Sequence, residues 1–385
     1  MIYPPLDHPA WLLAAFFLGS CIGSFLNVVI YRLPLGLSVN DPKRSFCPKC
    51  KSEIPMRRNI PLVSWLALRG KCADCSAPIS PRYFFVELLT GILFAAAYWV
   101  IIGRMVKPDE PELMLLALLP VWYAIAVFVA LSFIDIEHMI IPLELTITAT
   151  VAGLLAACAM PLLPDMVRWG SWEPTWVDGL KQSALGWVIG FFGLWAVVLG
   201  GKLLFGRIKM DSDEPLPWRL EEPTDDQSPI IFHMGEENLP WWDIFNRKSD
   251  RLVIEADSIK VNGKNQEAGT VTITENEIHL PDDSRIPLED LKSLEGTAKS
   301  AVVPREAMGM GDVHLMGLIG ALFGFVGVIF TLLASCLYAI LAAVCWRIGF
   351  GRPLPFGPFL VLGALTWFFG GWKIAQWYLE SLRFR

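Results

Sequence analysis

Blocks of apolar residues, each about as long as a bilayer is thick, constrain the fold of this chain more than any other feature. Apolar residues make up 54% of the 385 residues, and they are gathered in runs rather than spread evenly. A helix needs about 20 such residues to cross the hydrocarbon core, so we predict an all-α polytopic membrane protein with about eight transmembrane helices. The predicted spans are Trp11–Val29, Tyr83–Ile102, Leu113–Ile134, Ile140–Leu163, Ala184–Leu204, Val313–Phe323, Val326–Trp346 and Leu354–Trp377.

The predicted sixth span is short, and its boundary depends on a group of glycines. The stretch Val313–Trp346 is too long for one untilted span. Gly320, Gly324 and Gly327 offer a place for the chain to turn. We therefore predict two helices in this stretch.

Basic residues set the expected orientation. The segment 32–82, which we call the cysteine loop, carries ten basic residues against three acidic ones, and no other short loop comes close. Cytoplasmic loops of membrane proteins are enriched in Lys and Arg, so we place this loop in the cytoplasm and the N-terminus outside. Asp7 precedes the first span and no small-residue cleavage site follows it, so we expect that span to be retained rather than removed as a signal peptide.

Two acidic residues stand at the ends of predicted spans. Asp135 closes the run Tyr123–Ile134, and Asp312 follows Gly309–Gly311 and opens the next run. A carboxylate at the edge of hydrocarbon is costly to desolvate, so an acidic residue there is a candidate functional residue. Two predicted spans separate the pair, so both residues should lie on the cytoplasmic face of the membrane.

The acidic pair suggests acid–base chemistry. Two carboxylates a few ångströms apart cannot both carry a charge cheaply, so the pair would share one proton near neutral pH. The charged member can then activate a water while the protonated member donates its proton, as in aspartic proteases. The alternative is that each Asp caps a helix or reaches to the interface, and the residues by themselves leave both interpretations open.

Four cysteines in the cysteine loop form two CxxC pairs, Cys47 with Cys50 and Cys72 with Cys75. Four thiolates at this spacing are typical of a tetrahedral Zn²⁺ site. Disulfides are the alternative, but a loop assigned to the reducing cytoplasm argues against them. A redox-active CxxC is less favoured, because such motifs normally open a helix of a thioredoxin-like domain. We predict structural Zn²⁺, because the loop has too few apolar residues to form a core unaided.

Composition changes abruptly between the predicted fifth and sixth spans. The acidic insert, residues 205–303, contains 21 of the chain's 38 acidic residues and 11 of its 32 basic ones, so the rest of the chain is slightly basic. Its first half is rich in Pro, Trp and acid, and we expect it to be irregular. Its second half alternates as short strands do, with turns at Asn262-Gly263 and Asp282-Asp283, and predicts a small β-rich cytoplasmic domain reaching to about Leu294.

These features divide the chain into five segments. They are the first span (1–31), the cysteine loop (32–82), spans two to five (83–204), the acidic insert (205–303) and the last three spans (304–385). Nothing in the insert looks catalytic, so it is either a module for an unknown partner or a passive insertion in a surface loop. We expect contact with membrane lipid and no nucleic-acid partner.

Several short motifs follow one another in an order that is specific to one family. They are Gly19–Pro34, the two CxxC pairs with Asn59–Trp65 and Leu68–Gly70 between them, Ile79–Leu89, Ile134-Asp135 with Ile141-Pro142, Gly309–Val313 and Pro355–Phe359. On these motifs the chain resembles the type IV prepilin leader peptidases. These are bifunctional peptidases and N-methyltransferases of the GxGD group of membrane aspartic proteases (peptidase A24 type). The resemblance covers nearly everything except the acidic insert.

The resemblance implies an activity that spacing alone does not show. Such enzymes remove a short basic leader from prepilins of type IV pili and pseudopilins of type II secretion, at the cytoplasmic face of the inner membrane. They then methylate the new N-terminal residue with S-adenosylmethionine as the methyl donor. By the family pattern Asp135 and Asp312 are the catalytic pair. The cysteine loop belongs to members that also methylate, so we expect both activities here.

Three further features have weaker interpretations. Glu87 lies in a matching motif and is a candidate for the methyl-donor site, with an interfacial acidic residue as the alternative. Asn27 within the first span requires a polar partner in lipid. Pro355–Pro358 starts the last span, where freed backbone groups must be satisfied by protein or water, and is a candidate lining of the substrate cleft.

Two positions depart from the family pattern. Leu143 stands where an acidic residue usually follows the Ile-Pro pair, and His314 stands where a Lys usually follows the second Asp by two residues. We interpret His314 as a tolerated interfacial residue. Because His138 lies one helical turn from Asp135, the two histidines and the two aspartates also form a candidate set of metal ligands. The alternative function is therefore a metal-handling membrane protein or transporter, although the spans lack the repeat symmetry expected of a transporter.

Overall fold

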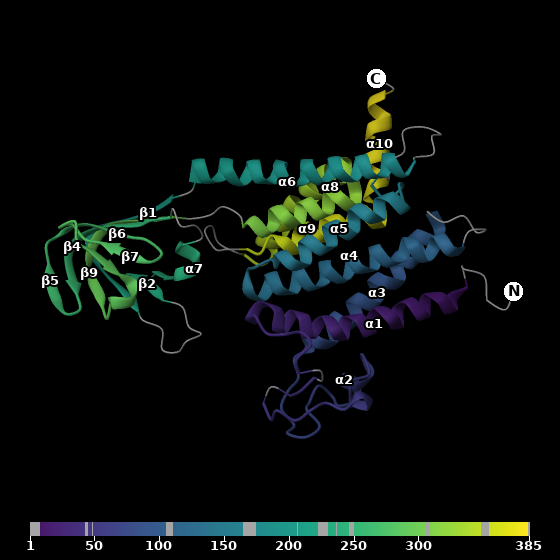
Figure 1. The fold of residues 1–385 in the computed structure, drawn as a ribbon, viewed down its shortest axis with the longest axis horizontal. Coiled ribbons are helices and arrows are strands. Elements are labelled where there is room, and N and C mark those ends of the chain that lie inside the picture. Colours follow the sequence, from purple (N-terminus) through teal and green to yellow (C-terminus); the bar gives the residue numbers. More distant parts are fainter. Residues whose placement is uncertain are drawn as a thin grey trace. The chain divides into compact units, whose positions relative to one another are not determined.

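The chain folds into two compact units, which we call the membrane unit and the sheet unit. The computed structural model describes residues 8–42, 45–47, 49–104, 111–164, 175–205, 207–221, 230–235, 237–245, 250–304, 309–347 and 354–383. The membrane unit comprises Met1–Trp195 and Gly309–Arg385, and the sheet unit comprises Ala196–Met308. Figure 1 shows long helices in the first and β-strands in the second. Residues 1–7, where the predicted first-span segment begins, lie outside the described residues.

Helices make up most of the membrane unit. They are α1 (Pro9–Arg32), α3 (Pro81–Arg104), α4 (Pro111–His138), α5 (Leu143–Ala159), α6 (Trp176–Phe205), which continues into the sheet unit, α8 (Met310–Cys345), α9 (Gly357–Thr366) and α10 (Trp372–Arg383), with the short α2 (Val63–Ala67) in the cysteine loop. Six described segments are long and apolar enough to cross a bilayer: Pro9–Leu35, Pro81–Ile102, Leu118–His138, Trp176–Lys202, Met310–Cys345 and Gly357–Leu382. The chain is therefore a multi-pass membrane protein, with fewer full-length spans among the described residues than the eight predicted.

Two local features account for the difference in span number. Helix α5 has 17 residues, slightly fewer than the about 20 that a full span needs. The predicted sixth and seventh spans lie in one continuous element, α8, in which two helices meet at a kink. Within it Gly324 has φ 67° and ψ −176°, and a Cβ there would lie 2.2 Å from the Pro164 carbonyl oxygen. Only glycine tolerates this conformation and this contact. The kink therefore lies at one of the three glycines where we predicted the boundary between two helices.

Helices α1 and α3 pack closely through glycines. A Cβ on Gly19 of α1 would lie 2.7 Å from Phe94 Cβ, and a Cβ on Gly23 would lie 2.7 Å from Glu87 Cα. In lipid no hydrophobic force drives helices together, so they associate through the van der Waals attraction that such close approach allows. The contact sets Glu87 of α3 directly against α1.

The sheet unit is a nine-stranded antiparallel sheet. Its order is β3-β2-β1-β9-β4-β6-β7-β8, with β5 paired to β4. The strands are β1 (Arg207–Glu221), β2 (Ile231–Met234), β3 (Glu237–Pro240), β4 (Leu252–Val261), β5 (Lys264–Gln266), β6 (Gly269–Ile273), β7 (Glu277–His279), β8 (Arg285–Pro287) and β9 (Leu294–Pro304), with the short helix α7 (Trp241–Ile244) after β3. A single core of buried apolar side chains covers the sheet from β1 to β9.

The first half of the acidic insert is not irregular, so that prediction is wrong for its described residues. The half contributes β1, β2, β3 and α7. The acidic, Pro-containing run after Asp211 is accommodated as a shift of register in the pairing of β1 with β9, between Asp211 and Leu216. Beyond it Trp218 and Leu220 alternate into the core. Burial of these side chains favours a strand over the disorder that the composition indicated.

The β-rich second half is confirmed, but the sheet extends past the predicted end at Leu294. Strand β9 runs to Pro304 and pairs with both β1 and β4, so it holds the two halves of the insert together. The predicted turn between β4 and β5 is confirmed, with positive φ at Asn262 (48°) and Gly263 (79°). These angles are those of the two-residue turn that suits the twist of a hairpin.

Replacement of Trp218 should unfold the sheet unit more easily. Its side chain is 1% exposed, and a Trp→Ala change in a core costs about 3–5 kcal/mol of the free energy of unfolding. We expect Trp218→Ala to accelerate limited proteolysis within residues 207–304 of the full chain in detergent. Lys260→Ala, on an exposed position of β4, is the matched control and should leave the rate unchanged. Equal protection of both variants would contradict this core assignment.

Candidate functional site

Asp135 is held near the end of α4 by a backbone hydrogen bond. Its side chain is 6% exposed. Its Oδ2 accepts a hydrogen bond from the Gly357 backbone N–H, with a nitrogen–oxygen distance of 3.0 Å. Gly357 is the first residue of α9, and helix N-termini favour negative charge because their N–H groups are unpaired and the dipole points there. The arrangement therefore suits the ionised form of Asp135.

Asp312 lies in the first turn of α8, close enough to Asp135 for the two charges to interact. The side chain is 8% exposed, and its charge interacts with that of Asp135. Its Oδ1 is buried without a hydrogen-bond partner among the described residues. A buried, unpaired carboxylate oxygen is costly, so this atom is poised for a proton or for a group that enters the site. The structure thus brings the two predicted residues together.

Three chain segments converge at the pair with little free space. A Cβ on Gly357 would lie 2.7 Å from Asp135 Oδ2 and 3.0 Å from Ile141 Cδ1, and a Cβ on Gly311 would lie 2.6 Å from Ile141 Cβ. The start of α8, the start of α9 and the segment after α4 therefore meet at Ile141. Sequence reasoning missed the role of Gly357 as the hydrogen-bond donor, although the Pro355–Phe359 motif contains it.

The histidines do not join the acidic pair in a metal site. His138 is exposed at the end of α4. The His314 ring packs edge-on against Phe191 of α6, with ring centroids 5.1 Å apart. Within the described part of the chain, only the four cysteines form a group of three or more potential ligands. The alternative of a metal-handling protein is not favoured.

The cysteine loop brings its four thiols to one point. The four Sγ atoms lie within 4.8 Å of one another, with 3.8 Å between Cys47 and Cys75 and 4.0 Å between Cys50 and Cys72. These distances are too long for disulfides, whose sulfurs are about 2.05 Å apart. They are close to the separation of about 3.8 Å between thiolates around one tetrahedral ion with metal–sulfur bonds of about 2.3 Å. The cluster has the geometry to bind a metal.

Two similar turns present these thiols. The Cys47 N–H donates to Ser52 O and the Cys72 N–H donates to Ala77 O, at 3.0 and 2.8 Å. The residue after each second cysteine, Lys51 or Ser76, has positive φ, at 59° and 57°. Hydrogen bonds from the side chain and the backbone of Ser52 lower the pKa of the Cys50 thiol to about 6. The lowered pKa favours the thiolate of Cys50, which is the form that binds metals.

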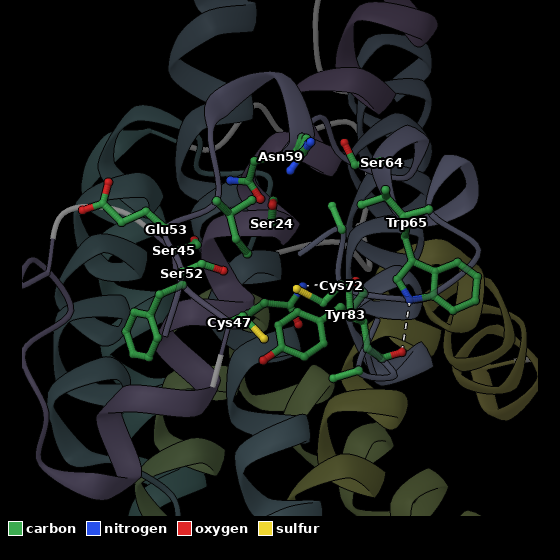
Figure 2. Close-up of a pocket in the computed structure, with 18 of the residues that line it drawn as sticks. Ser24, Ser45, Cys47, Ser52, Glu53, Asn59, Ser64, Trp65, Cys72 and Tyr83 are labelled. Atoms are coloured by element: carbon green, nitrogen blue, oxygen red, sulfur yellow. Dashed lines mark hydrogen bonds between the residues drawn. The ribbon is translucent and has the colours of Figure 1, made fainter. Parts of the chain in front are cut away.

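A pocket of about 370 Å³ lies between the cysteine loop, the C-terminal end of α1 and the N-terminal end of α3. Figure 2 shows loop residues, among them Asn59, Ser64 and Trp65, around it together with Tyr83 of α3. Glu87 also lines it, and its Oε2 accepts a hydrogen bond from the Leu62 N–H at 2.7 Å. Sequence reasoning singled out Glu87 but not the pocket, which forms only when the loop folds back on the helices.

Comparison with known proteins decides the family. The family model described as the bacterial peptidase A24 N-terminal domain matches residues 17–101. A relative from Klebsiella pneumoniae, named prepilin leader peptidase/N-methyltransferase, is 35% identical over 203 residues, which are 51% of this chain and 77% of the relative. The chain belongs to the prepilin leader peptidase/N-methyltransferase family.

Other members with the same name match to differing extents. The Myxococcus xanthus relative is 41% identical over 185 residues, 48% of each chain, so this chain spans about half the length of that relative. The Dickeya chrysanthemi relative is 35% identical over 219 residues, 51% of this chain and 68% of its own length. No solved structure matches the chain. The family match confirms the resemblance predicted from the ordered motifs.

Proposed function

We propose that this chain is a membrane aspartic endopeptidase that removes the short basic leader from type IV prepilins and pseudopilins and then N-methylates the new N-terminal residue. The observation that carries the proposal is the buried pair of Asp135 and Asp312 at the converging ends of α4, α8 and α9. Membership of a family named for both activities supports it.

The two carboxyl groups have different surroundings, and these suggest separate roles in peptide cleavage. Asp135, held by the Gly357 N–H, is the charged member and takes a proton from a water as the water oxygen attacks the scissile carbonyl carbon. Asp312, whose Oδ1 has no partner among the described residues, carries the shared proton and gives it to the leaving amide nitrogen as the C–N bond breaks. Burial keeps both groups away from bulk water, which strengthens their interaction.

The proposed orientation places the cysteine loop and the acidic pair at the cytoplasmic face of the inner membrane, with the N-terminus outside. The basic residues of the loop support this side. The interaction of Asp135 with Asp312 requires an even number of crossings between them. We assign these two crossings to α5 and α6. Helix α5 has only 17 residues, but a helix slightly shorter than the bilayer can cross it untilted at the modest cost of thinning the bilayer locally. Cleavage then occurs where the charged leader meets the apolar helix of the substrate.

The cysteine cluster and the methyl donor form the second half of the proposal. The Cys47, Cys50, Cys72 and Cys75 thiolates would hold a structural Zn²⁺ that fixes the fold of the loop. S-adenosylmethionine supplies the methyl group when bound.

Substitution of either aspartate should abolish cleavage. Asparagine keeps the shape of the side chain but cannot exchange the proton, so Asp135→Asn and Asp312→Asn should each lower the rate on a model prepilin at least about a thousandfold. Glu144→Gln, which removes an exposed carboxylate at the start of α5, is the control and should cleave normally. Appreciable cleavage by either Asp variant, with the protein inserted and folded, would show that the aspartic mechanism is wrong.

Gly357→Ala should slow cleavage without abolishing substrate binding. The added Cβ would lie 2.7 Å from Asp135 Oδ2, so the carboxylate must move, and a displacement of about 1 Å costs roughly a hundredfold in rate. The fall should appear in kcat rather than KM. Gly193→Ala, in α6, has nothing within 4 Å of the added atom and is the matched control. A normal kcat for Gly357→Ala would contradict the positioning role.

The purified protein should contain about one Zn²⁺ per chain. Cys50→Ser and Cys75→Ser should each lower the zinc content measured by elemental analysis, because each removes one of four ligands. Cys158→Ser, a free cysteine of α5 outside the cluster, should retain the full content. Full zinc in the loop variants would place the metal elsewhere.

A further inference from the structure

An ion pair joins the first turn of α3 to the last turn of α4. Arg82 Nη1 lies 2.6 Å from Glu137 Oε1 and also contacts Oε2, so one nitrogen of the guanidinium group reaches both carboxylate oxygens. The Arg82 side chain is 16% exposed and the Glu137 side chain 33% exposed. The guanidinium carbon of Arg82 also lies 5.0 Å from the centre of the Tyr83 ring. Arg82 is therefore held both by a carboxylate and by an aromatic ring.

This ion pair is poorly placed to stabilise either helix. Arg82 is the second residue of α3, and Glu137 is the next-to-last residue of α4. The helix dipole favours acidic residues at the start of a helix and basic residues at its end, so each charge stands at the unfavourable end of its own helix. In addition, Arg82 Nε is buried without a hydrogen-bond partner among the described residues, which costs free energy. Local stability therefore does not account for the pair.

The helical turn that carries Glu137 also carries Asp135. The Asp135 carbonyl oxygen accepts a hydrogen bond from the Met139 N–H at 2.9 Å, which closes this turn. Residues two apart on an α-helix point about 200° apart, so the two acidic side chains leave the turn on nearly opposite sides. The Gly357 N–H holds Asp135 on one side, and Arg82 holds Glu137 on the other. Rotation of the turn about the helix axis would break one of these two contacts.

We propose that Arg82 is a positioning residue of the peptidase, which acts through Glu137 to fix the turn of α4 that presents Asp135 to Asp312. The inference rests on the proposed peptidase function and adds a residue outside the acidic pair. Because Arg82 is the last residue of the cysteine loop, the ion pair also connects that loop to the cleavage site.

Cleavage of a model prepilin by the full chain in detergent tests this role. Arg82→Gln and Glu137→Gln each remove the ion pair and free the turn. We expect each variant to lower kcat about tenfold to a hundredfold, because a displacement of about 1 Å at a reacting group has an effect of this size. The KM should stay within about twofold, because substrate binding does not depend on the ion pair. The double variant should be no slower than the slower single variant, because both changes remove the same interaction.

Exchange of the two charges separates positioning from a direct contact with the substrate. Arg82→Glu combined with Glu137→Arg keeps an ion pair and puts each charge at the favourable end of its helix. This variant should therefore fold even where a single variant does not. We expect its kcat to lie within about tenfold of the wild-type value and above that of both single variants. If Arg82 acted on the substrate itself, the exchange would not restore cleavage.

The matched control is Arg219→Gln. Arg219 pairs with Glu221 at 3.3 Å in the sheet unit, where both side chains are exposed, and its replacement should leave kcat unchanged. Melting temperature reports whether each variant is folded. A normal kcat in folded Arg82→Gln, a loss confined to KM, an additive loss in the double variant, or an exchange that restores nothing would overturn the positioning role and leave the aspartic mechanism in place. An absence of cleavage by the wild type would overturn both.

Discussion

A hydrogen bond between two residues 222 positions apart, from the Gly357 N–H to Asp135 Oδ2, organises the acidic site. It joins the end of α4 to the start of α9, and Ile141 fills the space between Gly357 and Gly311 at the start of α8. Because neither glycine position has room for a Cβ, the helix ends approach until Asp312 interacts with Asp135. The close approach of backbones is thus the condition for the chemistry that we propose, and the glycines are required by space rather than by flexibility.

The cysteine loop follows a different physical logic. Few apolar side chains are buried in it, so its shape depends on the four thiols meeting at one point and on a small number of hydrogen bonds to the helices. The contact between the Leu62 N–H and Glu87 fastens the loop to α3, while Asn27 is fixed by the carbonyls of Gly23 and Tyr83. In our account, this protein therefore has two separate sites. The cleavage site lies where helix ends converge, and the pocket depends on the fold that the metal gives to the cysteine loop.

The features that could be predicted were those whose residues are costly or unusual at their positions in the sequence itself. Acidic residues at span boundaries and four cysteines at ligand spacing are rare without a function, so Asp135, Asp312 and the cysteine cluster could be found by inspection. The donor to Asp135 could not, because it is a backbone N–H far away in the chain. Strand β1 was missed for a related reason, because it depends on tertiary contacts with β9 and with the core around Trp218. Local composition, which suggested an irregular segment there, was overridden by packing.

The central claim is that Asp135 and Asp312 act as one unit that shares a proton. The most direct test is the pH dependence of kcat/KM for cleavage of a model prepilin by the wild type in proteoliposomes, between about pH 4 and pH 9. Two interacting carboxyl groups with one shared proton predict a bell-shaped profile, because cleavage needs one group charged and the other protonated. A rate that rises through a single ionisation and then stays level would contradict the account, since one carboxylate base would then suffice.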